Sequence, residues 1–149
     1  MTIRSSGIPA MEVLDILSSS GFNFYLTGSR SFGVEESNSD WDFYVEYSTE
    51  VENFLHENGF ENLGNYEGMA PISREIQKIK NVVRHRNCAI DIQLTTDLLL
   101  KNTMQEIVRE NFLFWSFNNK EHANQIWSAV ALGIKAGINL LTEHMVKPE

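Results

Sequence analysis

The sequence predicts an α/β domain of the α+β kind, with a small mixed β-sheet, helices mainly on one face and a C-terminal helical pair. Two segments, DWDFYVEY and CAIDIQL, alternate apolar and polar residues with the two-residue period of a half-buried strand. Segments with helical spacing lie between and after them. Because 149 residues with 42% hydrophobic content suffice for one core, we expect a single domain over 1–149, with a core at about 22–95 and C-terminal helices at about 97–142.

The N-terminal part of the chain predicts a helix followed by two strands. Apolar residues recur at helical spacing after Pro9, and the pattern stops near Gly21. The aromatic segment FNFYL suits a strand that ends at Thr27. In the next strand, residues 41, 43, 45 and 47 are apolar while 40, 42, 44 and 46 are polar, so one face is apolar and the other largely acidic.

The remaining elements follow from caps, periodicity and turn residues. Ser48 resembles the N-cap of a helix that Gly59 closes. The signals between residues 60 and 79 are mixed, and ISREIQKI stays open between helix and strand. NVVRH and CAIDIQL are predicted to form a hairpin, followed by a long helix capped by Thr96 or Asp97. Another helix is expected from about 120 to 141, in which Ala129 and glycines at 133 and 137 leave a stripe open to a packed helix, a homodimer or a protein partner.

Composition limits the function classes. A net charge of -8 and a pI near 5.0 argue against nucleic-acid binding through a broad basic surface. The single cysteine, Cys88, cannot form an internal disulfide, and we expect it to be buried. The basic residues of 78–86 could bind phosphate or a nucleic-acid acceptor, or could simply form a solvated hairpin edge. Neither a signal peptide nor an apolar run near the roughly 18 residues of a membrane span is present, so we expect a cytoplasmic protein without membrane contact.

One constellation of polar residues indicates chemistry. Asp40 and Asp42 project from the same face of one strand, and Asp91 would join them if its strand is a neighbour. Three hard oxygen donors suit Mg²⁺ or Mn²⁺. Upstream, Gly28 would let the backbone approach a ligand, Ser29 offers an N–H and a hydroxyl, and residue 30 is an arginine suited to phosphate. We expect Tyr44 and Gln93, on the faces of the aspartates, to line this site or to pack beneath it.

The run LTGSR, then SDWDFYV, then AIDIQL resembles the pattern of the nucleotidyltransferase-fold superfamily, the group related to polymerase beta and to small antibiotic-modifying and antitoxin-type nucleotidyltransferases. The match covers about 22–95, roughly half the chain. The resemblance implies a site in which Ser29 and the nearby backbone hold the triphosphate of an NTP. It also implies that Asp40 and Asp42 hold two divalent ions, and that Asp91 completes the metal site and helps to deprotonate the acceptor hydroxyl. Gly28 and Arg30 belong to the same nucleotide-binding turn.

The sequence thus predicts a metal-dependent nucleotidyltransferase that moves an NMP group from an NTP to an acceptor, which could be a small molecule, a protein or RNA. A catalytically inactive binding or regulatory module with the same fold, antitoxin-like or inhibitor-like, is the alternative. A nucleotide sensor or hydrolase is a third. Two departures from the family pattern stand out: Thr27 precedes the Gly-Ser pair in place of an apolar residue, and Glu35 and Glu36 add negative charge where the triphosphate should lie.

Overall fold

A computed structural model describes residues 8–33, 35, 39–64, 69–115 and 120–144. Among these, the side chains of 8, 112–115, 120–124 and 138–144 lie outside the description. Eleven elements follow one another along the described chain. They are α1 (Ile8–Ser18), β1 (Tyr25–Thr27), α2 (Gly28–Ser31), β2 (Trp41–Glu46), α3 (Thr49–Glu57), β3 (Phe60–Asn62), α4 (Pro71–Ile76), β4 (Ile79–His85), β5 (Ile90–Thr95), α5 (Leu98–Trp115) and α6 (Lys120–His144).

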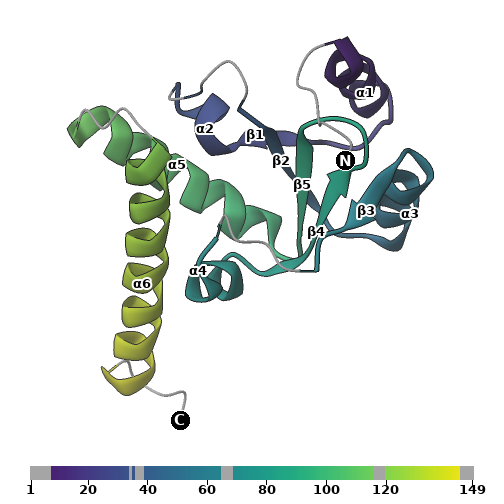
Figure 1. The fold of residues 1–149 in the computed structure, drawn as a ribbon. Coiled ribbons are helices and arrows are strands. Elements are labelled where there is room, and N and C mark those ends of the chain that lie inside the picture. Colours follow the sequence, from purple (N-terminus) through teal and green to yellow (C-terminus); the bar gives the residue numbers. More distant parts are fainter. Residues whose placement is uncertain (1–7, 34, 36–38, 65–68, 116–119, 145–149) are drawn as a thin grey trace.

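The five strands form one mixed sheet in the order β1-β2-β5-β4-β3. β2 and β5 pair in parallel, and the other neighbouring strands pair antiparallel. The predicted hairpin is therefore present as β4 and β5. A parallel pair needs a long crossover, which here contains α3, β3, α4 and β4 (Figure 1). The predicted mixed sheet is confirmed, and its two most informative strands lie side by side at its centre.

One face of the sheet carries the main apolar core. The alternation predicted for β2 and β5 is observed, because Val45, Ile90, Ile92 and Leu94 are buried together on this face. Helices α1 and α3 cover it with a further set of buried side chains, Ala10, Val13, Leu17, Val51 and Leu55. Cys88 belongs to the same core, as expected.

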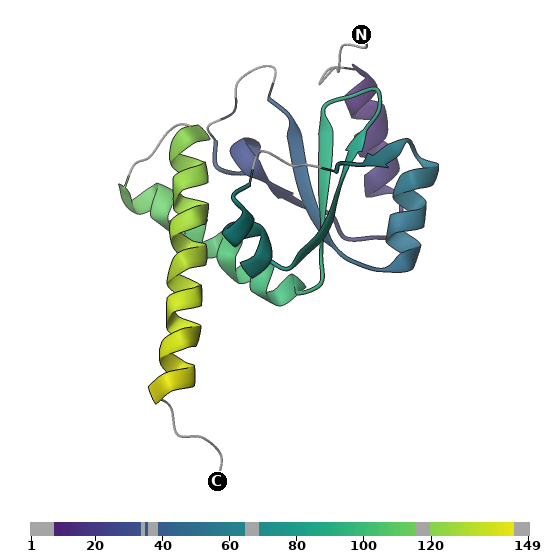
Figure 2. The same cartoon turned by 60° about the horizontal axis from the view of Figure 1, so that its bottom comes forward.

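The other face is covered as well, which corrects the expectation of helices mainly on one face. Helix α5 crosses it and α4 packs against α6 on the same side, whereas α1 and α3 lie on the far side of the sheet (Figures 1 and 2). The reason is chemical: Thr27 and Tyr44 on this face hydrogen-bond to Gln105 and Asn102 of α5. A polar sheet face can be buried when its polar groups find partners on the covering helix.

The predicted caps and the C-terminal helical pair are confirmed. Ser48 accepts a hydrogen bond from the backbone N–H of Val51 at 3.1 Å, and Asp97 accepts one from Leu100 at 3.1 Å. Each satisfies an otherwise unpaired N–H of the first helical turn. Helices α5 and α6 pack together around Val108 and Ile126.

Two segments differ in detail from the prediction. Only Tyr25–Thr27 of the expected strand FNFYL is paired, because β1 is an edge strand opposite only three residues of β2. The region that stayed open contains both β3 and α4, and α4 begins with Pro71 at its first turn. At the glycines of the small-residue stripe in α6, no described residue lies close, since a Cβ built at Gly133 or Gly137 meets nothing within 4 Å. A partner there stays a prediction.

Candidate functional site

The two central strands bring two aspartates together. Asp42 of β2 and Asp91 of β5 are directly opposite each other in the parallel register. By the alternation of both strands they project from the polar face. Asp40 lies two residues before Asp42, just ahead of β2, and is half-buried like it. The condition that the sequence left open is met, because the strand of Asp91 is the immediate neighbour of the strand of Asp42.

Gly28 places the Gly-Ser-Arg turn directly against Asp42. Its φ is +70°, in the left-handed region that side chains other than glycine rarely adopt. A Cβ built at this position would lie 3.0 Å from the Cβ of Asp42 and closer still to its Oδ2. Both the backbone conformation and the space therefore require glycine here. The turn and the acidic strand therefore lie against each other, and their joint role in one functional site stays a prediction.

Helix α5 holds the turn from the other side. Gln105 is buried; its Oε1 accepts a hydrogen bond from Thr27 Oγ1 at 2.8 Å, and its Nε2 donates to Ser31 Oγ at 3.1 Å. Arg109, one helical turn later, donates to the carbonyl of Ser31 at 3.3 Å. The departure at Thr27 has a structural reason, since its hydroxyl is one of these anchors. The four-residue helix α2 is thus fixed at both ends.

Arg30 is engaged within the chain. Its Nη2 donates to the carbonyl of Ser39 at 2.8 Å, and its guanidinium carbon lies 4.3 Å from the centre of the Trp41 ring. The hydrogen bond ties the turn to the segment before β2, and the cation–π contact ties it to the first residue of β2. Ser29 is half-buried in the same turn, beside Gly28. Phosphate binding by these residues stays a prediction.

Asp91 is paired with an arginine of the neighbouring strand. Arg84 Nε donates to Asp91 Oδ1 at 2.8 Å and Nη2 donates to Oδ2 at 2.9 Å, a bidentate contact across β4 and β5. Asp91 is only 2% exposed, whereas the side chain of Arg84 is 36% exposed. A carboxylate so deeply buried needs such a partner, because an uncompensated charge in the core is strongly destabilising.

This pairing bears on the metal site. Mg²⁺ and Mn²⁺ prefer carboxylate oxygens, so the side chains of Asp40 and Asp42 are of the chemical type that binds these cations. Both oxygens of Asp91, in contrast, accept from Arg84. Within the residues that the structure describes, no three His, Cys, Asp or Glu side chains gather closely enough to hold a metal ion together. The aspartates at 40 and 42 are therefore the better candidates for metal ligands.

Lys101 is a buried cation that the sequence analysis missed. This α5 residue is 1% exposed, and its Nζ hydrogen-bonds to Gln77 Oε1 at the end of α4. The Nζ also lies 4.2 Å from the centre of the Trp127 ring and 5.1 Å from that of Tyr44. Burial lowers the pKa of Lys101 to about 7, and the negative charge of Asp42 opposes this shift. A signal existed: Lys101 shares a helical stripe with the buried Met104.

Tyr44 and Gln93 pack beneath α5 and do not line an open site. They are opposite each other in the β2–β5 register and are 2% and 5% exposed. The Tyr44 hydroxyl donates to Asn102 Oδ1 at 2.6 Å. Burial, with the nearby Tyr25 and Glu106, raises the pKa of Tyr44 to about 12.

The basic residues of 78–86 do not form one surface. Arg84 turns to Asp91, His85 is buried with its ring edge-on to Phe60, and Arg86 is exposed. Lys80 lies 3.9 Å from the centre of the Tyr47 ring, a residue on the apolar face. Alternation separates Arg84 from His85, and the irregularity in the β4–β5 register between Ile79 and Asn81 accounts for Lys80 lying on the opposite side from Arg84. Of the two loop glutamates, Glu35 is exposed and Glu36 lies outside the described residues.

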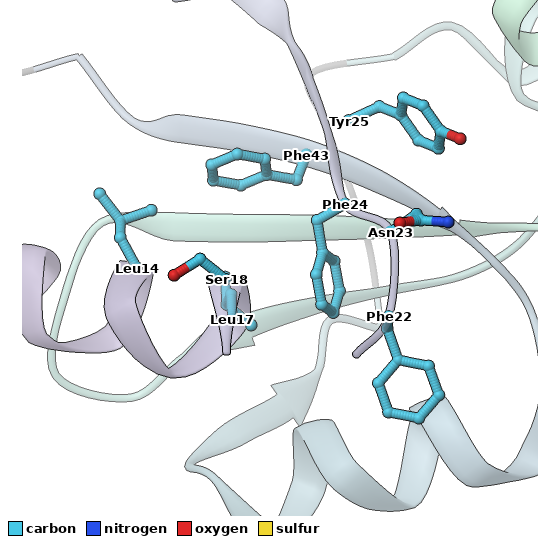
Figure 3. Close-up of a pocket in the computed structure, with 8 residues that line it drawn as sticks. All are labelled: Leu14, Leu17, Ser18, Phe22, Asn23, Phe24, Tyr25 and Phe43. Carbon is cyan, nitrogen blue, oxygen red and sulfur yellow. The ribbon is translucent and has the colours of Figure 1, made fainter. Parts of the chain in front are cut away.

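A separate cavity lies between α1 and the start of the sheet. It has a volume of about 390 Å³, and Figure 3 shows residues from α1, from the following segment and from β2 around it. The lining residues are Leu14, Leu17, Ser18, Phe22, Asn23, Phe24, Tyr25 and Phe43. Most of its lining residues belong to the core of the apolar face, so it is distinct from the acidic site.

Comparison with known proteins adds no relative: no family model matches the chain, and neither a curated protein nor a solved structure matches it. The resemblance to the nucleotidyltransferase-fold superfamily thus stays a prediction. No helix within the described part of the chain is long and apolar enough to cross a membrane. The cytoplasmic location also stays a prediction.

Proposed function

We propose that this protein is a metal-dependent nucleotidyltransferase, which transfers an NMP group from an NTP to an acceptor hydroxyl and releases pyrophosphate. The observation that carries the proposal is the contact of two segments. The Gly-Ser-Arg turn packs against Asp42 through Gly28, and Asp42 is in register with Asp91 on the neighbouring strand. A turn suited to phosphate and a pair of carboxylates then face the same ligand.

In this proposal the turn binds the triphosphate and the aspartates provide the electrostatics. The backbone and hydroxyl of Ser29 would hold phosphate oxygens, with the turn kept rigid by Gln105 and Arg109. Asp40 and Asp42 would hold divalent cations, which when bound stabilise the negative charge that develops on the phosphate. The acceptor oxygen forms a bond to the α-phosphorus as the bond to the β-phosphate bridge breaks, and pyrophosphate leaves with the electron pair.

The acceptor proton needs a base during this transfer. The sequence resemblance gives that role to Asp91, whose two oxygens accept from Arg84. Asp91 could take the proton only where Arg84 releases one of those oxygens, since a base must reach the hydroxyl directly or through one water. Asp42, half-buried on the next strand and in register with Asp91, is a second carboxylate that could act as this base.

The test is Mg²⁺-dependent transfer of label from each of the four α-³²P NTPs to RNA, protein and small-molecule acceptors. Asp42→Asn keeps the shape but removes the charge, and we expect it to lower transfer by more than about 100-fold, because metal stabilisation contributes several kcal/mol. Glu46→Gln is the matched control, since Glu46 lies on the same face of β2 but is exposed at its far end. Equal activity in Asp42→Asn and the control would exclude the proposed site.

A second function is favoured by the Arg84–Asp91 pair. A carboxylate that is already neutralised within the chain is compatible with a binding or regulatory module that keeps the fold without catalysis. Affinity capture would then recover a protein partner that stays bound after Asp40, Asp42 and Asp91 are all replaced by asparagine. Loss of that partner in the triple variant, with the variant still folded, would count against this alternative.

A further inference from the structure

The Arg84–Asp91 pair lies in the row of residues that crosses the sheet at the candidate site. The strand registers place Thr27, Asp42, Asp91 and Arg84 side by side across β1, β2, β5 and β4. The row continues to the exposed Glu61 of β3, which is opposite Arg84, so Arg84 lies between the buried Asp91 and an exposed carboxylate. Lys101, a fully buried cation on this side of the sheet, comes from α5 and hydrogen-bonds to Gln77.

The geometry of the pair is that of a strong interaction. Two parallel N–H···O contacts of 2.8 and 2.9 Å match the planar fork of a guanidinium to the two oxygens of a carboxylate. Because Asp91 is 2% exposed, solvent screens this attraction less than it would screen a surface pair, although the side chain of Arg84 is 36% exposed. A divalent cation that approached Asp91 would meet a fixed positive charge on the same oxygens, and like charges at such a distance repel strongly.

We propose that Arg84 is the resident counter-ion of Asp91 and excludes free divalent cations from Asp91. Asp42 and Asp91 then share a divalent cation only when an anionic ligand is bound together with that cation. Arg84 determines the specificity of the acidic pair: the pair accepts a metal–phosphate complex and rejects the bare ion. The binding of a metal–phosphate complex rests on the proposed function, which supplies a nucleoside triphosphate as the anion.

The anionic ligand changes the balance for a physical reason. A triphosphate brings several negative charges, which offset the repulsion between the metal and the guanidinium. Phosphate oxygens are also good acceptors for arginine, whose fork matches them as well as it matches a carboxylate. The side chain of Arg84 is 36% exposed, so a ligand on the polar face can reach the guanidinium, and Asp91, at 2% exposed, is reached by a metal ion only when Arg84 turns from its oxygens to the ligand.

The experiment measures Mn²⁺ binding by isothermal titration, first without any anion. Wild type is expected to bind Mn²⁺ weakly, and Arg84→Met is expected to bind it at least about tenfold more tightly, because the competing charge is gone. Arg86→Met is the matched control: it removes the same charge from the same hairpin, but Arg86 is exposed. This control should bind Mn²⁺ like wild type.

Two further variants assign the effect to Asp91. Arg84→Met with Asp91→Asn should lose the gain in Mn²⁺ affinity, and it also removes the buried charge that Arg84→Met leaves uncompensated. Arg84→Lys keeps a charge but cannot occupy both oxygens, so it should bind Mn²⁺ a few-fold more tightly than wild type. If Arg84→Met does not fold, Arg84→Lys takes its place. Mn²⁺ affinities equal to wild type in the folded single variants would overturn the proposal.

The anion is then supplied as the preformed Mn²⁺ complex of inorganic triphosphate or of a non-hydrolysable NTP, because these anions bind Mn²⁺ in solution. The complex is expected to bind wild type at least about tenfold more tightly than Mn²⁺ alone. Tight binding of Mn²⁺ alone to wild type, unchanged by the anion, would overturn the role of Arg84. If inorganic triphosphate strengthens Mn²⁺ binding but no nucleotide does, the proposed function fails while the role of Arg84 stands.

Discussion

Gly28→Ala is the substitution that most directly tests whether the turn and the acidic strand form one site. The change adds a single methyl group at a backbone with a φ of +70°. It also places that methyl group against the side chain of Asp42, 3.0 Å from its Cβ. Because the sheet fixes Asp42 and α5 fixes the turn, neither side can move without breaking hydrogen bonds.

Two costs add at this position. A left-handed backbone costs a residue with a Cβ about 1–2 kcal/mol. Overpacking against a fixed neighbour costs about 1–3 kcal/mol more. We therefore expect Gly28→Ala to lower the free energy of unfolding by about 2–5 kcal/mol, a large part of the stability of an ordinary domain.

Urea denaturation of Gly28→Ala and of a matched control separates the two costs. Gly33 has a φ of +74°, but a Cβ built there meets nothing within 4 Å. Gly33→Ala should therefore show the backbone cost alone, about 1–2 kcal/mol. The difference between the two variants is the contact with Asp42. It should shrink when Asp42→Ala is added to Gly28→Ala, because the carboxylate is then absent.

Equal losses of stability in Gly28→Ala and Gly33→Ala would refute the reasoning. The turn would then not be packed against Asp42, and the proposed site would lose the contact that joins its two halves. A loss confined to Gly28→Ala, relieved in the double variant, would support the close approach at the level of single atoms.

Two further predictions concern the buried polar face. Lys101→Met should be at least as stable as wild type at pH 7, because a buried charge replaced by an apolar side chain of similar size is often neutral or stabilising. Burial lowers the pKa of Lys101 from 10.5 to about 7, so the unfolded chain binds the lysine proton more tightly than the folded chain does. The contribution of Lys101 to the free energy of unfolding should therefore rise between about pH 7 and 10.5. Urea titrations across this range should show that rise in wild type relative to Lys101→Met, and parallel profiles would contradict it. Tyr44→Phe should cost about 1 kcal/mol through the lost bond to Asn102. It should also remove a phenol that ionises near pH 12 in alkaline absorbance titration, and an unchanged titration would contradict that assignment.

The features of the candidate site and of the fold that depend only on residues close in sequence were predictable. The period of two residues assigns Asp42 and Asp91 to polar faces, because successive side chains of any strand point to opposite sides. Ser48 and Asp97 were identifiable as caps because each bonds a backbone N–H three residues later. Lys101 carried a weaker local sign, its helical stripe with Met104, and was missed because a lysine on a helix is ordinarily exposed.

By itself, the sequence determined the type and faces of the main strands, the C-terminal helical pair and the order of turn, acidic strand and later aspartate. Only the tertiary structure decided that Asp91 faces Asp42 across a parallel pair and that Arg84 occupies its oxygens. Periodicity and capping arise within a few residues, whereas strand order and register depend on contacts between distant segments. The burial of Lys101 was decided in the same way, because α4, α5, α6 and β2 meet around it only in the folded chain.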